Sequence, residues 1–304
     1  MTAPADAGPR LLRGAPLAAA MRAALMPEVE ALRAATGFPP GLAVVLVGDD
    51  PPSAVYLHRI LHCCQEIGVD GQLVALGADA DADDVADAIG SLSADEHVAG
   101  ILVGQPLPPS IPLDVVLSRL DPVKDIDGIH PLNAGLLALG HETAAPATAQ
   151  AAVEILVRSG IPLTGRRVVV VGRSNIVGKP AALLLLRQHA TVTICHSRTV
   201  DLASETRRAD VVVVAAGRPG LITGDMLRPG AVVVDVGISV VDGRIVGDVD
   251  GSAYDVASAI TPVPGGVGPL TNAILVTHLV RAACSQALAR GLTEAAREAA
   301  EVIA

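Results

Sequence analysis

Short runs of valine and isoleucine that alternate with helical stretches constrain the fold of this chain most strongly. The second half carries four such runs, RRVVVVG, TVTIC, DVVVVAAG and AVVVDVGI. Strands that are apolar on both faces are typical of parallel sheets covered by helices. Aromatic residues make up 1% of the chain, so Val, Leu, Ile and Ala must build the core. We therefore expect an α/β fold, with a doubly wound, Rossmann-like sheet in the second half.

The first half shows the same alternation. The predicted elements are a helix over 16–36, strands at 42–48, 72–76 and 100–104, and helices at 53–64 and 84–92. A chain of 304 residues is long enough for two domains. We expect an N-terminal α/β domain over 1–145 and a Rossmann-like domain over 146–271. A helix over 272–304, interrupted near Gly291, would return to the first domain.

Charge and composition exclude several classes of function. The net charge of −10 disfavours nucleic acid and anionic membranes as partners, because neither polyanion gains from an acidic surface. No window approaches 18 uninterrupted apolar residues, and the N-terminus lacks the pattern of a signal peptide. The four cysteines show no CxxC spacing, which indicates reduced thiols. We expect a cytoplasmic protein that binds small molecules.

The segment VVVVGRSNIVGKP, residues 168–180, predicts a dinucleotide site. Gly172 ends a strand, while Gly178 and Pro180 begin a helix, so backbone N–H groups and the helix dipole would face an anion such as pyrophosphate. The spacing departs from GxGxxG, because Ser174 stands where the second glycine would be. The simpler alternative is a surface turn that binds nothing.

The end of the next strand indicates which dinucleotide would bind. Sites for NAD usually carry an acidic residue there, which holds the ribose hydroxyls. Here TVTIC is followed by His196, Ser197, Arg198 and Thr199, without an acid. Together with Arg173 these residues would form a basic, hydroxyl-bearing pocket. The pattern therefore favours a ribose 2′-phosphate, and hence NADP over NAD.

Two further segments flank GRSNIVGKP: PVKDIDGIHPLNAG at 122–135 and ITPVPGGVGPLT at 260–271. In this order the three segments resemble the bifunctional methylenetetrahydrofolate dehydrogenase/methenyltetrahydrofolate cyclohydrolase family over about 42–278. The resemblance implies hydride transfer from the methylene bridge of the folate to NADP, then hydrolysis of the methenyl product to formyltetrahydrofolate. It also implies a homodimer, with the folate in a cleft between two domains.

The resemblance implies roles for individual residues. Tyr56 would lie along the pterin, and Asp127 would accept hydrogen bonds from the pterin amino and ring N–H groups; these two are the expected catalytic-site residues. Taken alone, Asp127 could equally be a helix cap or turn aspartate. The implied loop over folate and nicotinamide contains Pro264, Gly265, Gly266, Leu270 and Thr271. The implied cofactor contacts are Thr148, Gly172, Arg173, Ser174, Ile176, Val177, Ser197, Arg198, Gly217 and Ile238.

The chain departs from the family pattern at the catalytic lysine, which follows the tyrosine by four residues. That position is Ile60, which cannot carry a proton. Arg59 is one position away, about 100° around a helix. The family's glutamine after GILV is replaced by Gly104. Gln105 is displaced by one residue, which in an extended segment turns its side chain to the opposite face.

A third departure affects the Pro-Cys-Thr-Pro-x-Gly segment, which survives only as PATAQA at 146–151. These losses predict weak or absent cyclohydrolase activity, whereas hydride transfer mainly requires that two rings are oriented. Three alternatives stay open. They are a fully bifunctional enzyme in which Gln105, His62 or water replaces the lysine, a non-catalytic paralogue that binds folate or NADP, and a dehydrogenase for another pterin.

His58 and His62 flank Ile60 on the same predicted helix and would point well away from its direction. We interpret them as exposed helix histidines. A metal site formed with Cys63 is not expected, since no fourth ligand is apparent.

Overall fold

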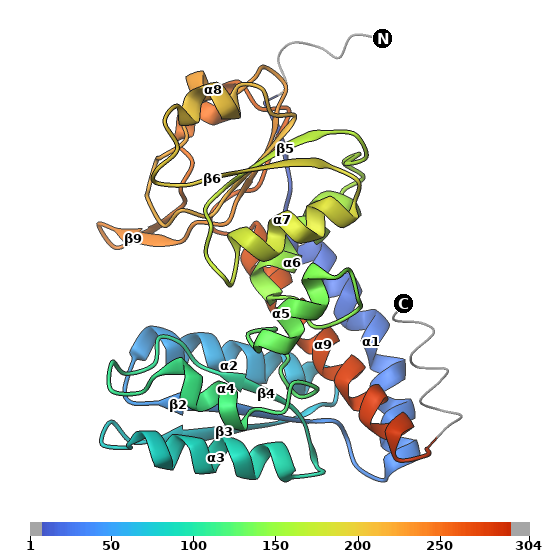
Figure 1. Cartoon of the computed structure of the whole chain (residues 1–304). Coiled ribbons are helices and arrows are strands. Elements are labelled where there is room, and N and C mark those ends of the chain that lie inside the picture. Colours follow the sequence, from blue (N-terminus) through green and yellow to red (C-terminus); the bar gives the residue numbers. More distant parts are fainter. Residues whose placement is uncertain (1–7, 293–304) are drawn as a thin grey trace. The chain divides into compact units, whose positions relative to one another are not determined.

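The computed structural model describes residues 8–292, which divide into two compact units (Figure 1). The large-sheet unit contains, of the described residues, 8–18, 137–141 and 148–271. The small-sheet unit contains residues 19–136, 142–147 and, of the described residues, 272–292. The helical segment expected over 293–304 lies outside the described residues.

The small-sheet unit is built on three parallel strands in the order β3-β2-β4. The strands are β2 (Gly41–Val47), β3 (Asp70–Leu76) and β4 (Val98–Val103), and the helices are α2 (Pro51–Glu66), α3 (Ala82–Ala94), α4 (Leu113–Arg119) and α5 (Pro131–Ala138). Every residue of β4 is buried, as its apolar run predicts, and β2 is buried along most of its length. The acidic segment before α3 caps that helix: Asp81 and Asp84 form a reciprocal capping box.

Two long helices contribute residues to both units: α1 (Gly14–Thr36), which continues through Pro27, and α9 (Val267–Ala289). Helix α9 begins earlier than the sequence predicts. It is long and apolar enough to cross a membrane, yet 67% of its apolar window is buried inside the structure, as in a core helix.

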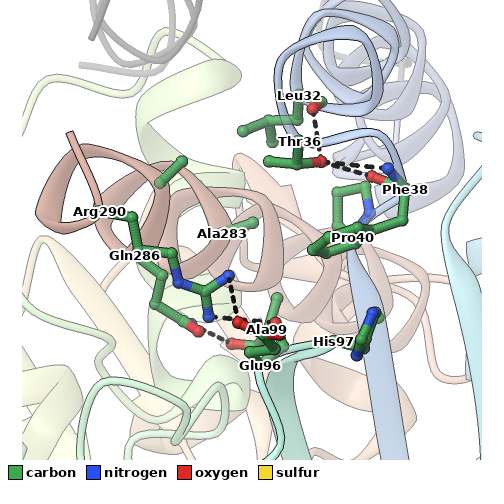
Figure 2. Close-up of a pocket in the computed structure, with 12 residues that line it drawn as sticks. Leu32, Thr36, Phe38, Pro40, Glu96, His97, Ala99, Ala283, Gln286 and Arg290 are labelled. Carbon is green, nitrogen blue, oxygen red and sulfur yellow. Dashed lines mark hydrogen bonds and ion pairs between the residues drawn. The ribbon is translucent and has the colours of Figure 1, made fainter. Parts of the chain in front are cut away.

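Figure 2 shows hydrogen bonds between the C-terminal end of α9 and the segment where β4 begins. Gln286 Nε2 donates to Ala99 O at 2.8 Å, and Arg290 donates to Glu96 O at 3.2 Å. The pocket between these contacts and α1 has a volume of about 30 Å³, enough for little more than a water molecule. It lies where β2 and β4 begin, so it is part of the helix attachment and not a ligand site.

The large-sheet unit contains a six-stranded parallel sheet in the order β1-β11-β8-β7-β5-β6. The strands are β1 (Arg10–Leu11), β5 (Arg167–Val171), β6 (Thr191–Cys195), β7 (Val211–Val214), β8 (Val232–Asp235) and β11 (Ala259–Ile260). The helices are α6 (Ala147–Arg158), α7 (Gly178–Arg187) and α8 (Leu202–Thr206), with short 3₁₀ segments at Gly224–Met226 and Gly251–Asp255. The predicted α/β class with a Rossmann-like sheet is confirmed, and the strand order reverses between β5 and β7.

Three features of this unit differ from the sequence prediction. The pair Arg10–Leu11 joins the large sheet beside β11, although the expected boundary assigned residues 1–145 to the other domain. Two residues are too few to show a strand periodicity. Helix α8, capped by Asp201, was not predicted, and neither was the antiparallel hairpin of β9 (Ser239–Val241) and β10 (Arg244–Val246).

Candidate functional site

The turn between β5 and α7 lies at the point where the strand order reverses, the usual ligand position in such sheets. Gly172 directly follows β5, with φ +135°, and its N–H donates to Cys195 O at 2.9 Å. A Cβ on Gly172 would overlap Ala215 O, and a Cβ on Gly178 would overlap Gly172 O. Both positions therefore require glycine, which lets the start of α7 approach the end of the strand closely.

The same turn presents free backbone donors. The Ser174 hydroxyl accepts from the N–H groups of Val177 at 3.1 Å and Gly178 at 3.3 Å, so the residue at the second glycine position pairs with two donors where α7 begins. Within the described chain, the N–H groups of residues 173–176 donate to no protein acceptor. This arrangement suits an anion at a helix N-terminus, as pyrophosphate binding requires.

The turn after β6 adds positive charge beside it. Strands β5 and β6 are paired in parallel, so Arg173 and Ser197–Arg198 follow the ends of neighbouring strands. His196 Nδ1 accepts the Arg198 N–H at 3.1 Å, which shapes this turn. Arg173 and Arg198 are exposed and form no ion pair with any described residue. The residues present therefore fit a dinucleotide with an additional phosphate.

The other expected cofactor residues occupy different positions. Gly217, with φ +63°, follows β7, and Ile238, 67% exposed, follows β8. Both lie just beyond the same end of the sheet as Gly172. Ile176, 49% exposed, and Val177 belong to the turn before α7. Thr148 is half-buried in the first turn of α6.

The Pro-Gly segment forms a tight turn before α9. Pro264 is exposed, and Gly265, with φ +105°, accepts the Gly14 N–H at 3.1 Å through its carbonyl. A Cβ on Gly266 would press against Thr261 and Pro262. The sequence prediction extended this loop through Leu270 and Thr271. Both instead lie buried in the first turns of α9, because the helix begins at Val267.

Helix α2 carries the residue pattern of a core helix. Its buried residues recur every three or four positions: Ser53, Leu57, Ile60, Cys64 and, just after the helix, Ile67. Ile60 is 0% exposed, so it belongs to the core stripe. His58, Arg59 and His62 are exposed. His58 Nδ1 contacts Ala54 O at 2.7 Å, and His62 lies 3.8 Å from Glu66. Neither histidine lies on the Ile60 face.

Gly104 follows β4 and lies against α2. Its N–H donates to Val45 O at 2.8 Å. A Cβ on Gly104 would lie 3.0 Å from Leu57 Cδ1, so Leu57 fills the space that a larger side chain at 104 would need. Gln105 is exposed, and its carbonyl accepts the Ser53 hydroxyl at 3.0 Å. The displaced glutamine therefore does not occupy the position of Gly104.

The two aspartates of KDIDG have different environments. Asp125 is 2% exposed, and its carboxylate accepts from Ile129 N–H (3.2 Å), His130 N–H (2.8 Å) and Asn133 Nδ2 (2.8 Å). Asp127 accepts only the N–H of Ala147, the first residue of α6, at the long distance of 3.4 Å. Asp125 therefore holds the loop together, whereas Asp127 keeps acceptor capacity for a ligand.

Burial raises the pKa values of both Asp127 and Tyr56. Burial raises the pKa of Asp127 to about 7; the Ala147 N–H opposes this shift, and the Asp125 charge adds to it. Burial, and then the charge of Asp127, raise the pKa of the Tyr56 hydroxyl. Tyr56 is still 40% exposed, so its ring can be contacted by a ligand. The phenol of Tyr56 thus lies close enough to the titratable carboxyl of Asp127 to be affected by its charge.

Two buried basic residues near Asp127 have structural contacts. Lys124 Nζ donates to Leu92 O at 3.2 Å and Asp95 O at 2.6 Å. His278, on α9, contacts Ile126 O through Nδ1 at 2.8 Å; since a carbonyl can only accept, Nδ1 carries the proton. Burial lowers the pKa of His278 to about 4, so the ring is neutral. His278 is not among the residues predicted from the sequence, yet it positions the residue before Asp127.

Two other features of the described residues bear on where the site lies. Among residues 8–292, no group of three His, Cys, Asp or Glu side chains is arranged to hold a metal ion. A cavity of about 460 Å³ lies beside the Asp125 loop and is lined partly by Asn133, His278 and Arg281. Neither Tyr56 nor Asp127 lines it.

Comparison with known proteins decides the family. Residues 12–127 match the catalytic domain of tetrahydrofolate dehydrogenase/cyclohydrolase, and residues 146–287 match the NAD(P)-binding domain of the same enzymes. The chain belongs to the tetrahydrofolate dehydrogenase/cyclohydrolase family. Within this family, the bifunctional protein FolD of Chloroflexus aurantiacus is 51% identical over 275 residues, which are 90% of this chain and 96% of that protein.

Solved structures of the tetrahydrofolate dehydrogenase/cyclohydrolase family have the same fold as this chain. Bifunctional FolD from Campylobacter jejuni superposes with a TM-score of 0.88 at 41% identity, covering 90% of this chain and 98% of that one. FolD from Trypanosoma brucei, solved with NADP cofactor and an inhibitor, gives a TM-score of 0.86 at 36% identity, with 95% and 100% of the two chains covered. The NAD(P)-binding class expected for the large-sheet unit is thereby confirmed.

Proposed function

We propose that this protein oxidises methylenetetrahydrofolate to methenyltetrahydrofolate in one-carbon metabolism, with NADP as the hydride acceptor. The observation that carries the proposal is the Tyr56–Asp127 pair, which offers an aromatic face and a free carboxyl acceptor to a pterin. The family membership supports the substrate class, and the turn at Gly172 supports the cofactor class.

The residues of this chain would act mainly by binding and orientation. Tyr56 would pack along the pterin, and the ionised Asp127 would accept its amino and ring N–H groups. Bound NADP supplies the hydride-accepting nicotinamide. The turn at Gly172 would hold the pyrophosphate through its free N–H groups. Pro264 and Gly265 would form a close backbone surface against a flat ring.

NADP is proposed over NAD because of the charges at the ends of β5 and β6. Arg173 and Arg198 offer guanidinium groups, and Ser197 a hydroxyl, where NAD sites usually carry an acid. The NADP-bound relative from Trypanosoma brucei supports the same assignment.

For the second activity, hydrolysis of the methenyl bridge, we propose a weak or absent rate. Ile60 occupies the position of the family's lysine, is fully buried, and cannot transfer a proton. Gly104 has no side chain to take the role of the family's glutamine, and a Cβ there would lie 3.0 Å from Leu57 Cδ1. The second candidate is the fully bifunctional enzyme. The relatives that are 51% and 49% identical favour it, since both are bifunctional FolD proteins.

We also propose a cytoplasmic homodimer. The β9–β10 hairpin supports a partner copy, because Val240, Val241 and Ile245 are 72%, 43% and 47% exposed on it. Apolar side chains gathered on a projecting hairpin are typical of a surface that another chain covers. The molar mass in solution at micromolar concentration tests this assignment.

The dehydrogenase proposal is tested by following NADP reduction with purified protein and methylenetetrahydrofolate. We expect turnover that depends on both ligands, with NAD a poorer acceptor. Tight NADPH binding without turnover would identify a non-catalytic paralogue instead. Turnover with another reduced pterin, but not with methylenetetrahydrofolate, would reassign the substrate.

A further inference from the structure

Two buried carboxylates lie behind the cofactor-side turns of the large-sheet unit. Asp235 ends β8 and is 4% exposed, and Asp248 follows the β9–β10 hairpin and is 0% exposed. Neither is among the residues that the family pattern assigns to the site. Each is engaged by backbone N–H groups of segments distant in sequence.

Asp235 organises the turn that contains Ile238. Its Oδ1 accepts the N–H of Gly237 at 2.9 Å and the N–H of Asp248 at 3.0 Å, and its Oδ2 accepts the N–H of Val249 at 3.0 Å. Its own N–H donates to the Thr261 hydroxyl at 2.7 Å, which precedes the Pro-Gly turn. Both side-chain oxygens of Asp235 therefore have N–H donors.

Asp248 organises the turn that contains Gly217. Its Oδ2 accepts the N–H groups of Ala216 at 2.7 Å and Gly217 at 2.8 Å. Its Oδ1 is buried and has no hydrogen-bond partner among the described residues. Asp248 therefore holds the turn through a single oxygen atom, Oδ2.

The surrounding backbone is shaped around these two carboxylates. A Cβ on Gly237 would overlap the carboxyl group of Asp248, and a Cβ on Gly247 would overlap that of Asp235. Glycine is thus required on both sides of the hairpin, before β9 and after β10, so that the carboxylates can reach the backbone donors. Hydrogen bonds to ionised acceptors are stronger than neutral ones, and they fix the turns accordingly.

We propose that Asp235 and Asp248 are positioning residues for the nicotinamide dinucleotide: they set the turns at Gly217 and Ile238, which lie at the ends of neighbouring strands. The proposal rests on the proposed cofactor site. It assigns no direct contact with the cofactor to either carboxylate, since both are buried behind the turns. Loss of the anchor at Asp248 would move the Gly217 turn and weaken cofactor binding.

Asp248 accepts hydrogen bonds through one oxygen and Asp235 through both, so substitution by asparagine should affect the two positions differently. In Asp248→Asn, the amide oxygen can accept from Ala216 and Gly217, while the NH₂ group takes the place of the partnerless Oδ1. In Asp235→Asn, the NH₂ group must face a backbone N–H in either orientation, because both oxygens are accepting. Asparagine should therefore be tolerated at 248 and not at 235.

The test is titration of NADPH, followed by its fluorescence, into wild-type protein and four variants: Asp248→Asn, Asp248→Ala, Asp235→Asn and Asp250→Ala. Asp250 caps a nearby 3₁₀ turn and is the matched control. We expect Asp248→Asn and Asp250→Ala to bind within about threefold of wild type. We expect Asp248→Ala and Asp235→Asn to bind about tenfold more weakly or worse.

Far-UV circular dichroism at the titration temperature verifies folding, and the KM values for NADP and for the folate are compared where turnover is measurable. A purely structural role would lower stability without raising the KM for NADP selectively over the KM for the folate. Should Asp248→Ala fail to fold, the Asn variants at 235 and 248 still separate the outcomes. Equal binding by these two variants, or wild-type affinity in Asp248→Ala, would overturn the inference. No NADPH binding by wild type would overturn the proposed function as well.

Discussion

The Tyr56 hydroxyl lies within electrostatic range of the Asp127 carboxyl, whose charge contributes to the raised pKa of the phenol. Asp127 in turn has a pKa raised to about 7, because burial is opposed only by one long hydrogen bond from the Ala147 N–H. Tyr56 therefore remains protonated at neutral pH, while Asp127 titrates there. The pair combines an aromatic surface with an acceptor whose strength depends on pH.

The raised pKa of Asp127 predicts how stability depends on pH. Between its ordinary value of 3.8 and about 7, the folded state binds more protons than the unfolded state, so this group lowers the free energy of unfolding as pH rises. Asp127→Asn should remove that loss and be more stable than wild type at pH 8, by about 1–3 kcal/mol. Urea unfolding at pH 5 and pH 8 measures the difference.

Asp125→Asn is the matched control for that experiment. Both oxygens of Asp125 accept hydrogen bonds, so the amide leaves donors facing each other at any pH. We expect a loss of about 1–3 kcal/mol at both pH values. The account of Asp127 fails if Asp127→Asn has the same pH slope as wild type.

Folate binding should follow the ionisation of Asp127. Because the carboxylate is the better acceptor for pterin N–H groups, the KM for methylenetetrahydrofolate should fall as pH rises from 6 to 8. Asp127→Ala should raise this KM by about 10- to 100-fold and remove its pH dependence. Initial rates at saturating NADP across this pH range provide the measurement. A wild-type KM for methylenetetrahydrofolate that does not change with pH would contradict the role of Asp127 as the pterin acceptor.

Cofactor preference should depend on the two unpaired arginines at the ends of β5 and β6. Arg198→Ala should raise the KM for NADP about tenfold or more and leave the KM for NAD nearly unchanged, because only NADP carries the 2′-phosphate. Arg187→Ala, at the exposed end of α7, is the control and should affect neither. Parallel loss of both cofactors in Arg198→Ala would show that this side chain does not recognise the phosphate.

Restoring the hydrolytic residues should require space as well as charge. Gly104→Gln alone places its Cβ 3.0 Å from Leu57 Cδ1 and should destabilise the fold by about 1–3 kcal/mol. Leu57→Val should relieve part of that cost. We expect Ile60→Lys in this double-variant background to raise the rate of methenyltetrahydrofolate hydrolysis, measured against Ile60→Met. Equal rates for the lysine and methionine variants would contradict a proton-carrying role at this position.

The parts of the site that depend on local spacing were predictable. The strand, turn and helix around Gly172 are adjacent in sequence, and their glycines lie where the backbone needs them. The sequence also predicts helix α2, but the burial of Ile60 depends on which face meets the sheet. Long-range hydrogen bonds leave no spacing signal, so the Asp235–Asp248 arrangement and the contact of His278 with Ile126 became visible only in the structure.

The start of α9 illustrates a different limit. The Pro-Gly segment predicts a loop, and the sequence GPLT at 268–271 carries no pattern that indicates a helix beginning at Val267. Leu270 and Thr271 are therefore buried helix residues in the structure, although the family pattern places them in the loop.

The most direct test of the central claim is the decay of methenyltetrahydrofolate absorbance with purified wild-type protein, in a buffer that does not itself accelerate hydrolysis. The same preparation must first reduce NADP with methylenetetrahydrofolate. With Ile60 buried at the lysine position, the account predicts decay at the spontaneous rate while hydride transfer proceeds. Decay accelerated to a rate comparable with hydride transfer would contradict it and establish a fully bifunctional enzyme with another proton carrier.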